Sequence, residues 1–321
     1  LSFSFDWFKK DTKDMLMERP IPLYVGSGSP LSNVGTLTNQ GIELEVGYKL
    51  SVDKVNLSFL ANASYVKNEI KNLGNQTGYI DKESLPTLGT VSRNENGYPI
   101  GYFFGYKAIG VFQTQEEIDS YISPATGKPI QPNAAPGDTK FEDLNGDGVI
   151  SDDNEDRTMI GKPNPDWMVG LTVAADWNGF DLSAFFQGSF GADVFDALRR
   201  YELAAVNYTS DALERWTGPG TSNSMPRIVL GDTPKNFRPS TLLVHDASFL
   251  RLRNLQVGYT LPAQLTRKAY IQRLRFYASF DNLLTITGYK GMDPEIGSTM
   301  GIDKGVYPQA RVYTFGLNLT F

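Results

Sequence analysis

The strongest constraint on this chain is a period of two in its hydropathy, which recurs in segment after segment. In residues 41–50 the even positions are isoleucine, leucine, valine, tyrosine and leucine, whereas the odd positions are glycine, glutamate or lysine. In residues 56–66 leucine, phenylalanine, alanine and tyrosine alternate with asparagine and serine. Because successive side chains of a strand point to opposite faces, each segment has one apolar and one polar face. The pattern therefore predicts β-strands.

Eight segments follow this period and are predicted to be strands. Asn178-Gly179 separates two of them and supplies the positive φ angles of a tight hairpin turn. Arg253 is in phase with the apolar Leu255, so we expect a bulge near Asn254. The eight segments are 1–8, 41–50, 56–66, 167–177, 180–190, 247–260, 274–281 and 313–321.

The connections between these segments alternate in length. Long connections are expected over 9–38, 67–166, 191–246 and 285–308, and short ones over 51–55, 178–179 and 261–271. Transmembrane β-barrels of the outer membrane have this alternation, with long loops outside the cell and short turns in the periplasm. A soluble β-sandwich has no reason to place every long loop at one end. We therefore predict an all-β fold, a transmembrane antiparallel β-barrel, with the C-terminus on the periplasmic side.

The composition agrees with a membrane barrel and excludes several other classes. No run of about 18 uncharged apolar residues exists, so helical membrane spans are not expected. The mean hydropathy of −0.29 is compatible with a barrel, since lipid-facing and lumen-facing residues alternate. The chain has 16 Tyr and 19 Phe, which suits aromatic belts at the two membrane interfaces.

The absence of cysteine and the single histidine limit the chemistry of the chain. No disulfide, no thiolate nucleophile and no multi-histidine metal site can form within these 321 residues. The net charge of −6 argues against nucleic-acid binding as a main role. The chain also begins inside an alternating strand, so we expect it to be an arc of a larger barrel whose upstream part lies elsewhere.

Residues 143–154 read DLNGDGVISDDN, close to the calcium loop D-x-[DN]-x-[DN]-G. Carboxylate, amide and backbone oxygens at alternate positions are the ligands that Ca²⁺ takes in such a loop. The twelfth position is Asn154 where the motif has a bidentate glutamate, and Asp153, Glu155 or Asp156 could substitute. A turn without metal is equally compatible with these residues. The candidate ligands are Asp143, Asn145, Asp147, Val149 and Asp153.

Two other groups of residues contain residue types that occur at functional sites. His245, Asp246 and Ser248 contain the residue types of a catalytic triad, but residues this close on one strand mostly point apart, so catalysis is not expected. The segment 97–107 is rich in glycine and aromatic residues. It could stack on sugars or peptides, although a packed hairpin inside the large loop is the preferred interpretation, followed by a short helix from Gln115.

Several motifs resemble the SusC branch of the TonB-dependent receptors. Asn39–Leu44 looks like the NxGxE strand entry of these barrels, and the segment 105–113 resembles their GYK..GIFQ region. The terminal aromatic Phe321 resembles the signal read by the barrel-assembly machinery. Further segments similar to the family are 136–138, 143–148, 160–163, 248–251, 282–285, 291–295 and 307–309.

This resemblance implies a 22-stranded barrel with an N-terminal plug, of which these eight strands would be the last. It also implies a SusD-like surface lipoprotein as a lid and energy supplied by TonB. Neither a plug nor a TonB box can be matched in residues 1–321, so the plug is expected outside this chain.

The resulting hypothesis is active import of a nutrient, a glycan or a peptide, across the outer membrane of a bacterium of the Bacteroidetes type. The protein would be a transporter and not an enzyme, and it would contact the lipid bilayer but no nucleic acid. The alternative is a surface adhesin or binding protein built as a soluble β-sandwich. The polar residues expected to line the conduit are Glu43, Glu45, Asn62, Asp181, Gln187, Arg275 and Asp281.

Overall fold

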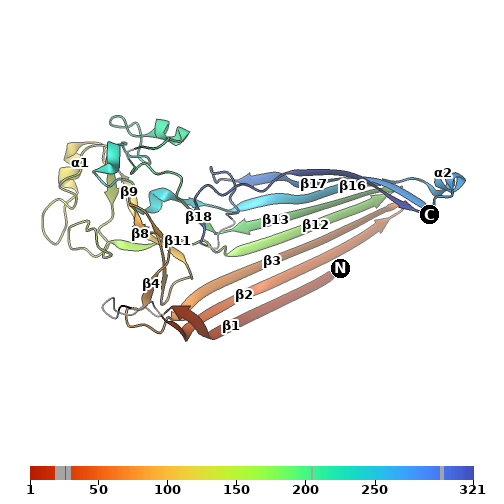
Figure 1. Ribbon diagram of the computed structural model, residues 1–321, viewed down its shortest axis with the longest axis horizontal. Coiled ribbons are helices and arrows are strands. Elements are labelled where there is room, and N and C mark those ends of the chain that lie inside the picture. The colour runs from red at the N-terminus through yellow and green to blue at the C-terminus, as the bar shows by residue number, and fades with distance from the viewer. Residues whose placement is uncertain (19–25, 27–29, 204, 297–299) are drawn as a thin grey trace.

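The computed structural model describes residues 1–18, 26, 30–203, 205–296 and 300–321. Its dominant feature is a single sheet of eight long antiparallel strands, with most of the other elements gathered at one end of the sheet (Figure 1). Neighbours in the sheet follow one another along the chain, so the strands form an up-and-down meander. In spatial order they are β1 (Ser2–Glu18), β2 (Leu31–Val52), β3 (Val55–Asn72), β12 (Trp167–Trp177), β13 (Phe180–Phe190), β16 (Phe249–Thr260), β17 (Arg273–Thr287) and β19 (Val312–Thr320).

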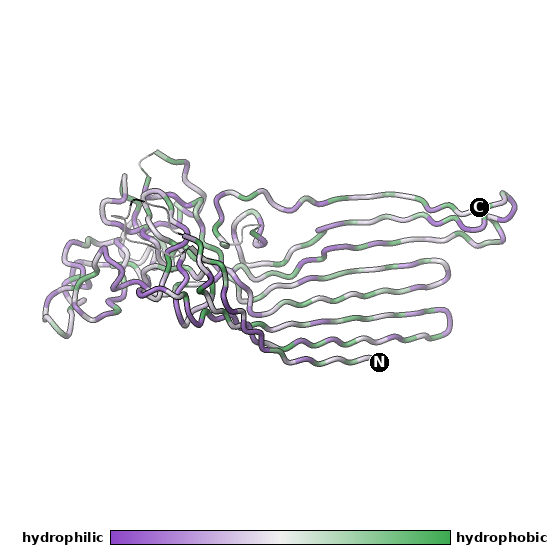
Figure 2. The backbone as a smooth tube through the Cα atoms, turned by 60° about the horizontal axis from the view of Figure 1, so that its bottom comes forward, coloured by the Kyte–Doolittle hydropathy of each residue, from purple (hydrophilic) through white to green (hydrophobic). Residues whose placement is uncertain are grey.

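The register of the strands places polar side chains on one face of the sheet and apolar side chains on the other. Glu45 pairs with Asn62, Asn62 with Gly170, and Gly170 with Gln187, so a polar row crosses four strands. The next row along the strands is apolar, and hydropathy alternates along much of the sheet (Figure 2). The period of two in the sequence therefore becomes one polar and one apolar face.

The apolar face has no protein packed against it in the described part of the chain. Phe3, Trp7 and Phe315 expose 67%, 66% and 75% of their surface. A β-sandwich would bury such a face against a second sheet about 10 Å away. The single layer seen here does not support the sandwich alternative.

The two ends of the sheet differ in their connections (Figures 1 and 2). At one end β2 and β3 are joined by a tight turn in which Asp53 has a φ of 52°, and β12 and β13 by Asn178 and Gly179 with φ of 47° and 87°. The short helices α2 (Ala263–Thr266) and η5 (Arg267–Ala269) join β16 to β17 at this same end, close to the C-terminus. The long connections all lie at the opposite end.

Several strands are longer than the hydropathy predicts. The connection expected over 9–38 is wrong at both ends, because β1 continues to Glu18 and β2 begins at Leu31. The loop expected from 67 begins later, after Asn72, and the loop expected from 285 begins after Thr287. Backbone pairing continues into segments where apolar and polar residues do not alternate regularly, so the hydropathy pattern does not mark these segments as strands. Within the expected loops, residues 19–25, 27–29, 204 and 297–299 lie outside the described residues.

The bulge predicted near Asn254 is confirmed. The register between β16 and β17 shifts between Leu252 and Asn254, and that between β13 and β16 shifts between Phe185 and Phe186. Arg253 is therefore an extra residue relative to β13, whereas on the β17 side Asn282 and Leu283 together oppose it. Such a bulge re-aims the Arg253 side chain relative to the ladder.

The long connections fold together into a loop assembly with its own small sheets. Its core is a cluster of buried side chains from distant segments: Leu85, Val91, Phe103, Phe195, Ala197, Leu243 and Ile302. Its strands are β4 (Tyr79–Asp81), β5 (Ser84–Leu85), β6 (Gly89–Thr90), β7 (Ser92–Glu95), β8 (Tyr102–Tyr106), β9 (Ala108–Val111), β10 (Thr139–Phe141), β11 (Arg157–Gly161), β14 (Asp193–Asp196), β15 (Val244–Asp246) and β18 (Ile302–Asp303).

Helices are few and short in this assembly. They are α1 (Gln115–Ser120), η2 (Ser210–Glu214), η3 (Leu230–Asp232) and η4 (Thr241–Leu243). The expected helix from Gln115 is confirmed, and the Thr114 side chain caps it by accepting the Glu117 N–H. None of the helices in the described residues is long and apolar enough to cross a membrane.

Candidate functional site

A hollow of about 520 Å³ lies on the polar face of the large sheet. Gly170 contributes to it because a Cβ at that position would lie only 2.6 Å from Oδ1 of Asn62. Four of the seven predicted conduit residues line the hollow. Its lining residues are Ser4, Asp6, Glu43, Leu44, Glu45, Asn62, Ala63, Ser64, Met168, Val169, Gly170, Phe185 and Gln187.

The hollow is acidic. Asp6, Glu43 and Glu45 place three carboxylates on its wall, and within the described part of the chain none of them forms an ion pair. Asp6 accepts a hydrogen bond from the Ser4 hydroxyl at 3.2 Å, on the same strand. The wall therefore offers hydrogen-bond acceptors and negative charge to whatever passes along it.

One side of this hollow is fastened to the loop assembly through Arg253. Its Nε donates to Oε1 of Gln187 at 2.7 Å, and its Nη1 donates to Oδ1 of Asn282 at 3.2 Å. Its Nη2 is paired with the carboxylate of Glu295, which lies in the loop between β17 and β18. The bulge at Arg253 thus aims a guanidinium at both the conduit wall and a loop.

A second arginine strengthens this link. The Arg251 side chain is only 2% exposed and pairs with the carboxylates of Asp293 and Glu295. Asp293 in turn accepts the backbone N–H of Gln309 at 3.0 Å. Sequence analysis missed this cluster, because the contacts join residues more than forty positions apart and no local pattern marks them.

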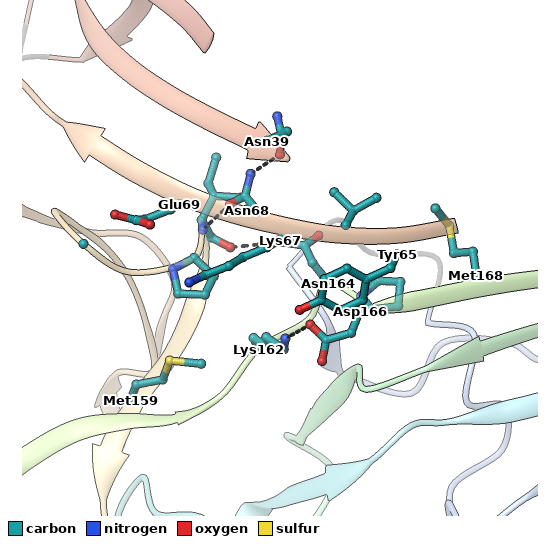
Figure 3. Close-up of a pocket in the computed structure, with 15 residues that line it drawn as sticks. Asn39, Tyr65, Lys67, Asn68, Glu69, Met159, Lys162, Asn164, Asp166 and Met168 are labelled. Atoms are coloured by element: carbon teal, nitrogen blue, oxygen red, sulfur yellow. Dashed lines mark hydrogen bonds and ion pairs between the residues drawn. The ribbon is translucent and has the colours of Figure 1, made fainter. Parts of the chain in front are cut away.

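A larger hollow, of about 560 Å³, lies at the loop end of β2, β3 and β12 (Figure 3). Met168 lines both hollows, so the two adjoin at the wall of the sheet. Figure 3 shows Lys162 paired with Asp166, which is four residues further along the same segment, and Asn68 reaching Asn39. Its remaining lining residues are Tyr65, Val66, Lys67, Glu69, Gly97, Pro99, Ile100, Met159, Asn164 and Pro165.

Asparagine side chains hold the loop that borders this hollow. Asn68 Nδ2 donates to Asn39 Oδ1 at 2.6 Å, and Asn68 Oδ1 accepts the Ile100 N–H at 2.8 Å. Asn164 Nδ2 donates to the Ile100 carbonyl at 3.1 Å. The segment around Ile100 is thereby fixed against β3 and against the segment that leads into β12.

The remaining predicted conduit residues lie on the polar face outside the two hollows. Asp181 pairs with Arg275, with Arg275 Nε donating at 2.9 Å, and Asp281 accepts from Asn254 Nδ2 at 2.6 Å. Both pairs cross the sheet between neighbouring or next-neighbouring strands. The structure therefore brings part of the predicted set into one hollow and uses the rest in cross-strand contacts.

In the 143–154 loop, Asp143 organises the backbone. Its Oδ1 accepts the Gly146 N–H at 2.8 Å and its Oδ2 accepts the Gly148 N–H at 2.9 Å. Gly146 and Gly148 have φ of 76° and 88°, which accounts for the two glycines. The buried Asp156 closes the loop by accepting the N–H groups of Leu144 and Ser151.

The candidate ligands of this loop are only partly gathered. Asn145 Nδ2 contacts Oδ2 of Asp147 and Oε2 of Glu155, each at 3.0 Å. Asp153 instead accepts from the Ser151 hydroxyl and the Glu155 N–H, and Val149 is exposed, with its N–H donated to Asp147. Among the residues that the structure describes, no group of three or more acidic or histidine side chains is arranged to hold a metal ion.

The structure does not assemble a catalytic triad at 245–248. His245 Nε2 faces Asp196 at 3.8 Å, and burial lowers the pKa of this imidazole. The Ser248 hydroxyl oxygen accepts the Gly191 N–H at 3.1 Å, and the Ser248 N–H donates to Asp246. The hydroxyl therefore has a structural contact and is not bonded to the imidazole.

The aromatic segment 97–107 is a packed hairpin, as preferred from the sequence. Ser92 of β7 pairs with Phe103 of β8, and the side chains of Tyr102, Phe103, Phe104 and Tyr106 are all buried. Burial raises the pKa of the Tyr102 hydroxyl, which donates to Glu95. These rings are therefore not available as a stacking surface.

Comparison with known proteins identifies a family that this chain resembles. The family model described as TonB dependent receptor-like, beta-barrel, matches residues 1–283. TonB-dependent receptor P3 of Formosa agariphila is 32% identical over 335 residues, covering 100% of this chain and 32% of that protein. TonB-dependent receptor SusC of Bacteroides thetaiotaomicron is 30% identical over 323 residues, covering 98% of this chain and 30% of that protein.

Solved structures agree with these relatives. The structure of the RagAB peptide transporter superimposes with a TM-score of 0.76 at 27% identity, covering 99% of this chain and 33% of that chain. The RagAB peptide importer in its open-open state gives the same TM-score of 0.76. The chain thus spans about a third of the length of the curated relatives it matches.

Proposed function

The chain belongs to the TonB-dependent receptor-like β-barrel family, and on that premise we propose that it forms part of the wall of an outer-membrane importer driven by TonB. The all-β barrel architecture predicted from the sequence is confirmed by the family match and by the RagAB structures. The activity of the whole transporter, its cargo and its partners are proposed.

One observation carries the proposal: the two faces of the same sheet suit two different solvents. The outer face exposes large apolar side chains such as Trp177 and Leu317, as a lipid-facing wall requires. The inner face carries the acidic hollow that includes Glu43, Glu45 and Asn62. A polar inner face next to an apolar outer face is the arrangement of a conduit through a membrane.

We place the loop assembly outside the cell and the tight turns, with the C-terminus, in the periplasm. Every long connection lies at one end of the sheet, which is how outer-membrane barrels are built. Trp177, Phe180 and Tyr259 cluster beside the Asn178–Gly179 turn, with ring centroids 6.2 Å and 4.4 Å apart, and would form an aromatic belt at the periplasmic interface.

We propose that these strands are the last eight of a 22-stranded barrel that encloses a plug supplied from outside this chain. In the described sheet β1 and β19 have a neighbour on one side only. An open sheet edge is not tolerated in the hydrocarbon of a bilayer, so further strands must complete the wall.

For cargo, we propose a peptide or an oligosaccharide, delivered with a SusD-like surface lipoprotein as a lid. One relative bears the name SusC, and the structural neighbour is titled a peptide transporter. The relatives are named as receptors and transporters rather than enzymes. The lid would rest on the loop assembly, which forms the end of the molecule that faces outward in this orientation.

We also propose that the 143–154 loop holds a Ca²⁺ ion that stiffens the loop assembly. Asp143, Asn145 and Asp147 have the required spacing, and Asn145 sits between the carboxylates of Asp147 and Glu155. A cation at this point would neutralise both carboxylates. Glu155, rather than Asp153, is then the carboxylate that replaces the missing ligand at position 154.

The import proposal is tested by growth of the source bacterium after in-frame deletion of the whole gene. Cultures are supplied with either a peptide mixture or an oligosaccharide mixture as sole carbon source. Loss of growth on one of them, reproduced by inactivating TonB, supports import of that class. Normal growth on both, with reduced attachment to surfaces, would instead favour the adhesin alternative.

A further inference from the structure

A separate pocket lies inside the loop assembly, away from the conduit wall. It has a volume of about 370 Å³ and shares no lining residue with the two hollows on the sheet. Its walls come from five segments that are distant in sequence: 87–88, 106, 152–157, 202 and 231–239. The pocket therefore exists only when the loops are folded together.

One wall of this pocket carries two guanidinium groups around one aromatic ring. The guanidinium carbons of Arg157 and Arg238 lie 5.7 Å and 4.7 Å from the ring centroid of Tyr106. The Tyr106 hydroxyl donates to the Ser151 carbonyl at 2.7 Å, which fixes the ring. The two cations are thus held in place by stacking as well as by hydrogen bonds.

Each guanidinium has a buried nitrogen without a hydrogen-bond partner. Arg157 uses Nη2 on the Phe104 carbonyl at 2.8 Å, but its Nε is buried and unpaired. Arg238 uses Nε on the Lys235 carbonyl at 3.2 Å, but its Nη1 is buried and makes no hydrogen bond. An Asp152 carboxylate oxygen lies 3.8 Å from Arg238 Nη1, which is beyond hydrogen-bonding distance.

The same pocket contains a buried carboxylate with a free oxygen. The Glu202 side chain is 8% exposed, and its Oε1 is bound by Arg200 and by the Thr87 hydroxyl. Its Oε2 is buried and has no partner. An unpaired carboxylate oxygen in a buried site costs free energy unless a donor reaches it.

A second carboxylate, that of Asp232, adds negative charge near Glu202. Asp232 is 6% exposed and accepts the N–H groups of Asn236 and Phe237 at 2.9 Å and 2.8 Å. Burial, with a contribution from the charge of Glu202, raises the pKa of Asp232 to about 6. The negative side of the pocket therefore holds two buried carboxylates, and Arg200 reaches Glu202 only through Oε1.

We propose that this pocket binds a small zwitterion, with its ammonium group on Glu202 and Asp232 and its carboxylate on Arg157 and Arg238. A neutral polyol could reach Oε2 of Glu202 and the two guanidiniums, but only with hydrogen bonds that have one charged partner, which are weaker than those between two charged groups. A simple anion would serve the guanidiniums and repel the two carboxylates. A ligand with both charges, such as a free amino acid or the ends of a short peptide, satisfies all the unpaired groups at once.

The site is independent of the import proposal, because binding in the loop assembly does not require passage through the barrel. The test is calorimetric titration of the full-length protein in detergent with four probes: L-alanine, dialanine, N-acetyl-dialanine and dialanine amide. We expect a zwitterionic probe to bind, and each capped derivative to bind about tenfold more weakly or worse, as expected for one lost charged hydrogen bond. Comparing L-alanine with dialanine distinguishes a free amino acid from a peptide as the source of the zwitterion.

Two variants assign the ends of the ligand. Glu202→Gln should weaken the binding of dialanine about tenfold and leave the already weak binding of N-acetyl-dialanine unchanged. Likewise, Arg238→Gln should weaken the binding of dialanine and leave the already weak binding of dialanine amide unchanged. Glu83→Gln is the matched control, because Glu83 is a loop glutamate paired with Lys304 at 3.2 Å and lies outside the pocket. Equal binding of capped and uncapped probes, or no binding of any probe at millimolar concentration, overturns the proposal.

Discussion

Arg275 and Asp181 meet directly over Gly258 on the inner face of the sheet. Arg275 Nε donates to Asp181 Oδ1 at 2.9 Å, although the two residues belong to β17 and β13 with β16 between them. A Cβ built on Gly258 would lie 2.5 Å from both carboxylate oxygens of Asp181. The missing side chain therefore opens the space through which an ion pair joins two strands that are not neighbours.

Replacing Gly258 by alanine should force this pair apart. We expect the free energy of unfolding to fall by about 1–3 kcal/mol, as for other overpacked sites. The measurement is urea unfolding of the full-length barrel in lipid vesicles. Gly288→Ala is the matched control, because no atom lies within 4 Å of a Cβ built there. A Gly258 variant as stable as this control would contradict the role assigned to the glycine.

A bulky side chain in the acidic hollow should obstruct the conduit. Asn62→Trp points into the hollow, whereas Ala61→Trp on the same strand points to the opposite, apolar face. We expect the first variant to abolish most uptake of the nutrient identified by the deletion strain, and the second to retain it. The measurement is the initial uptake rate at equal surface amounts of protein. Similar rates in both variants would show that the hollow is not on the route.

Calcium should protect the loop assembly from proteolysis. Removal of Ca²⁺ with a chelator is expected to speed cleavage within 143–154, because the carboxylates of Asp147 and Glu155 would then repel without neutralisation. Asp143→Asn should be cleaved at the fast rate with or without Ca²⁺. Asp119→Asn in α1, an exposed carboxylate outside the loop, is the control and should behave like the unaltered protein. If the unaltered protein is cleaved at the same rate with and without Ca²⁺, the proposed calcium site is wrong.

The segment around Asp232 should be most stable at acidic pH. The pKa of this carboxyl is raised from 3.8 to about 6, so the folded state holds the proton more tightly than the unfolded state does. Local stability is therefore fully present below about pH 4 and falls as the pH rises to about 6, by at most about 3 kcal/mol. The check is hydrogen exchange of the 230–240 peptide, expressed as protection at pH 5 and at pH 7.5.

Asp232→Asn should remove most of this pH dependence, since the amide cannot ionise and its oxygen can still accept one of the two N–H groups. A protection ratio between the two pH values that is unchanged by the substitution would show that another group controls the segment.

The architecture of the sheet was accessible from the sequence because its determinants are local. Alternation identified all eight strands, Asn178-Gly179 marked a hairpin, and the phase of Arg253 marked the bulge. The extensions of β1 to Glu18 and of β2 from Leu31 were missed, because apolar and polar residues do not alternate regularly in these segments.

The sites were less accessible, because they depend on contacts between distant segments. The alternation predicts that Glu45, Asn62 and Gln187 lie on the same face of the sheet. It does not predict the hollow that they line. The sequence does not predict the pairing of Arg251 with Asp293 or the pocket around Glu202. Each depends on loops whose path is set by tertiary packing. In both cases the sequence shows charged residues but not their partners.

The most direct test of the account is a spin-label scan along β12 in the full-length protein in lipid vesicles. This chain has no cysteine of its own, so single cysteines at positions 169–174 provide unique labels once any others are removed. We predict that oxygen, which concentrates in lipid, reaches the labels at 169, 171 and 173, and that a water-soluble nickel chelate reaches those at 170, 172 and 174. Equal access of the chelate to all six positions would contradict a wall with lipid on one side and an aqueous conduit on the other.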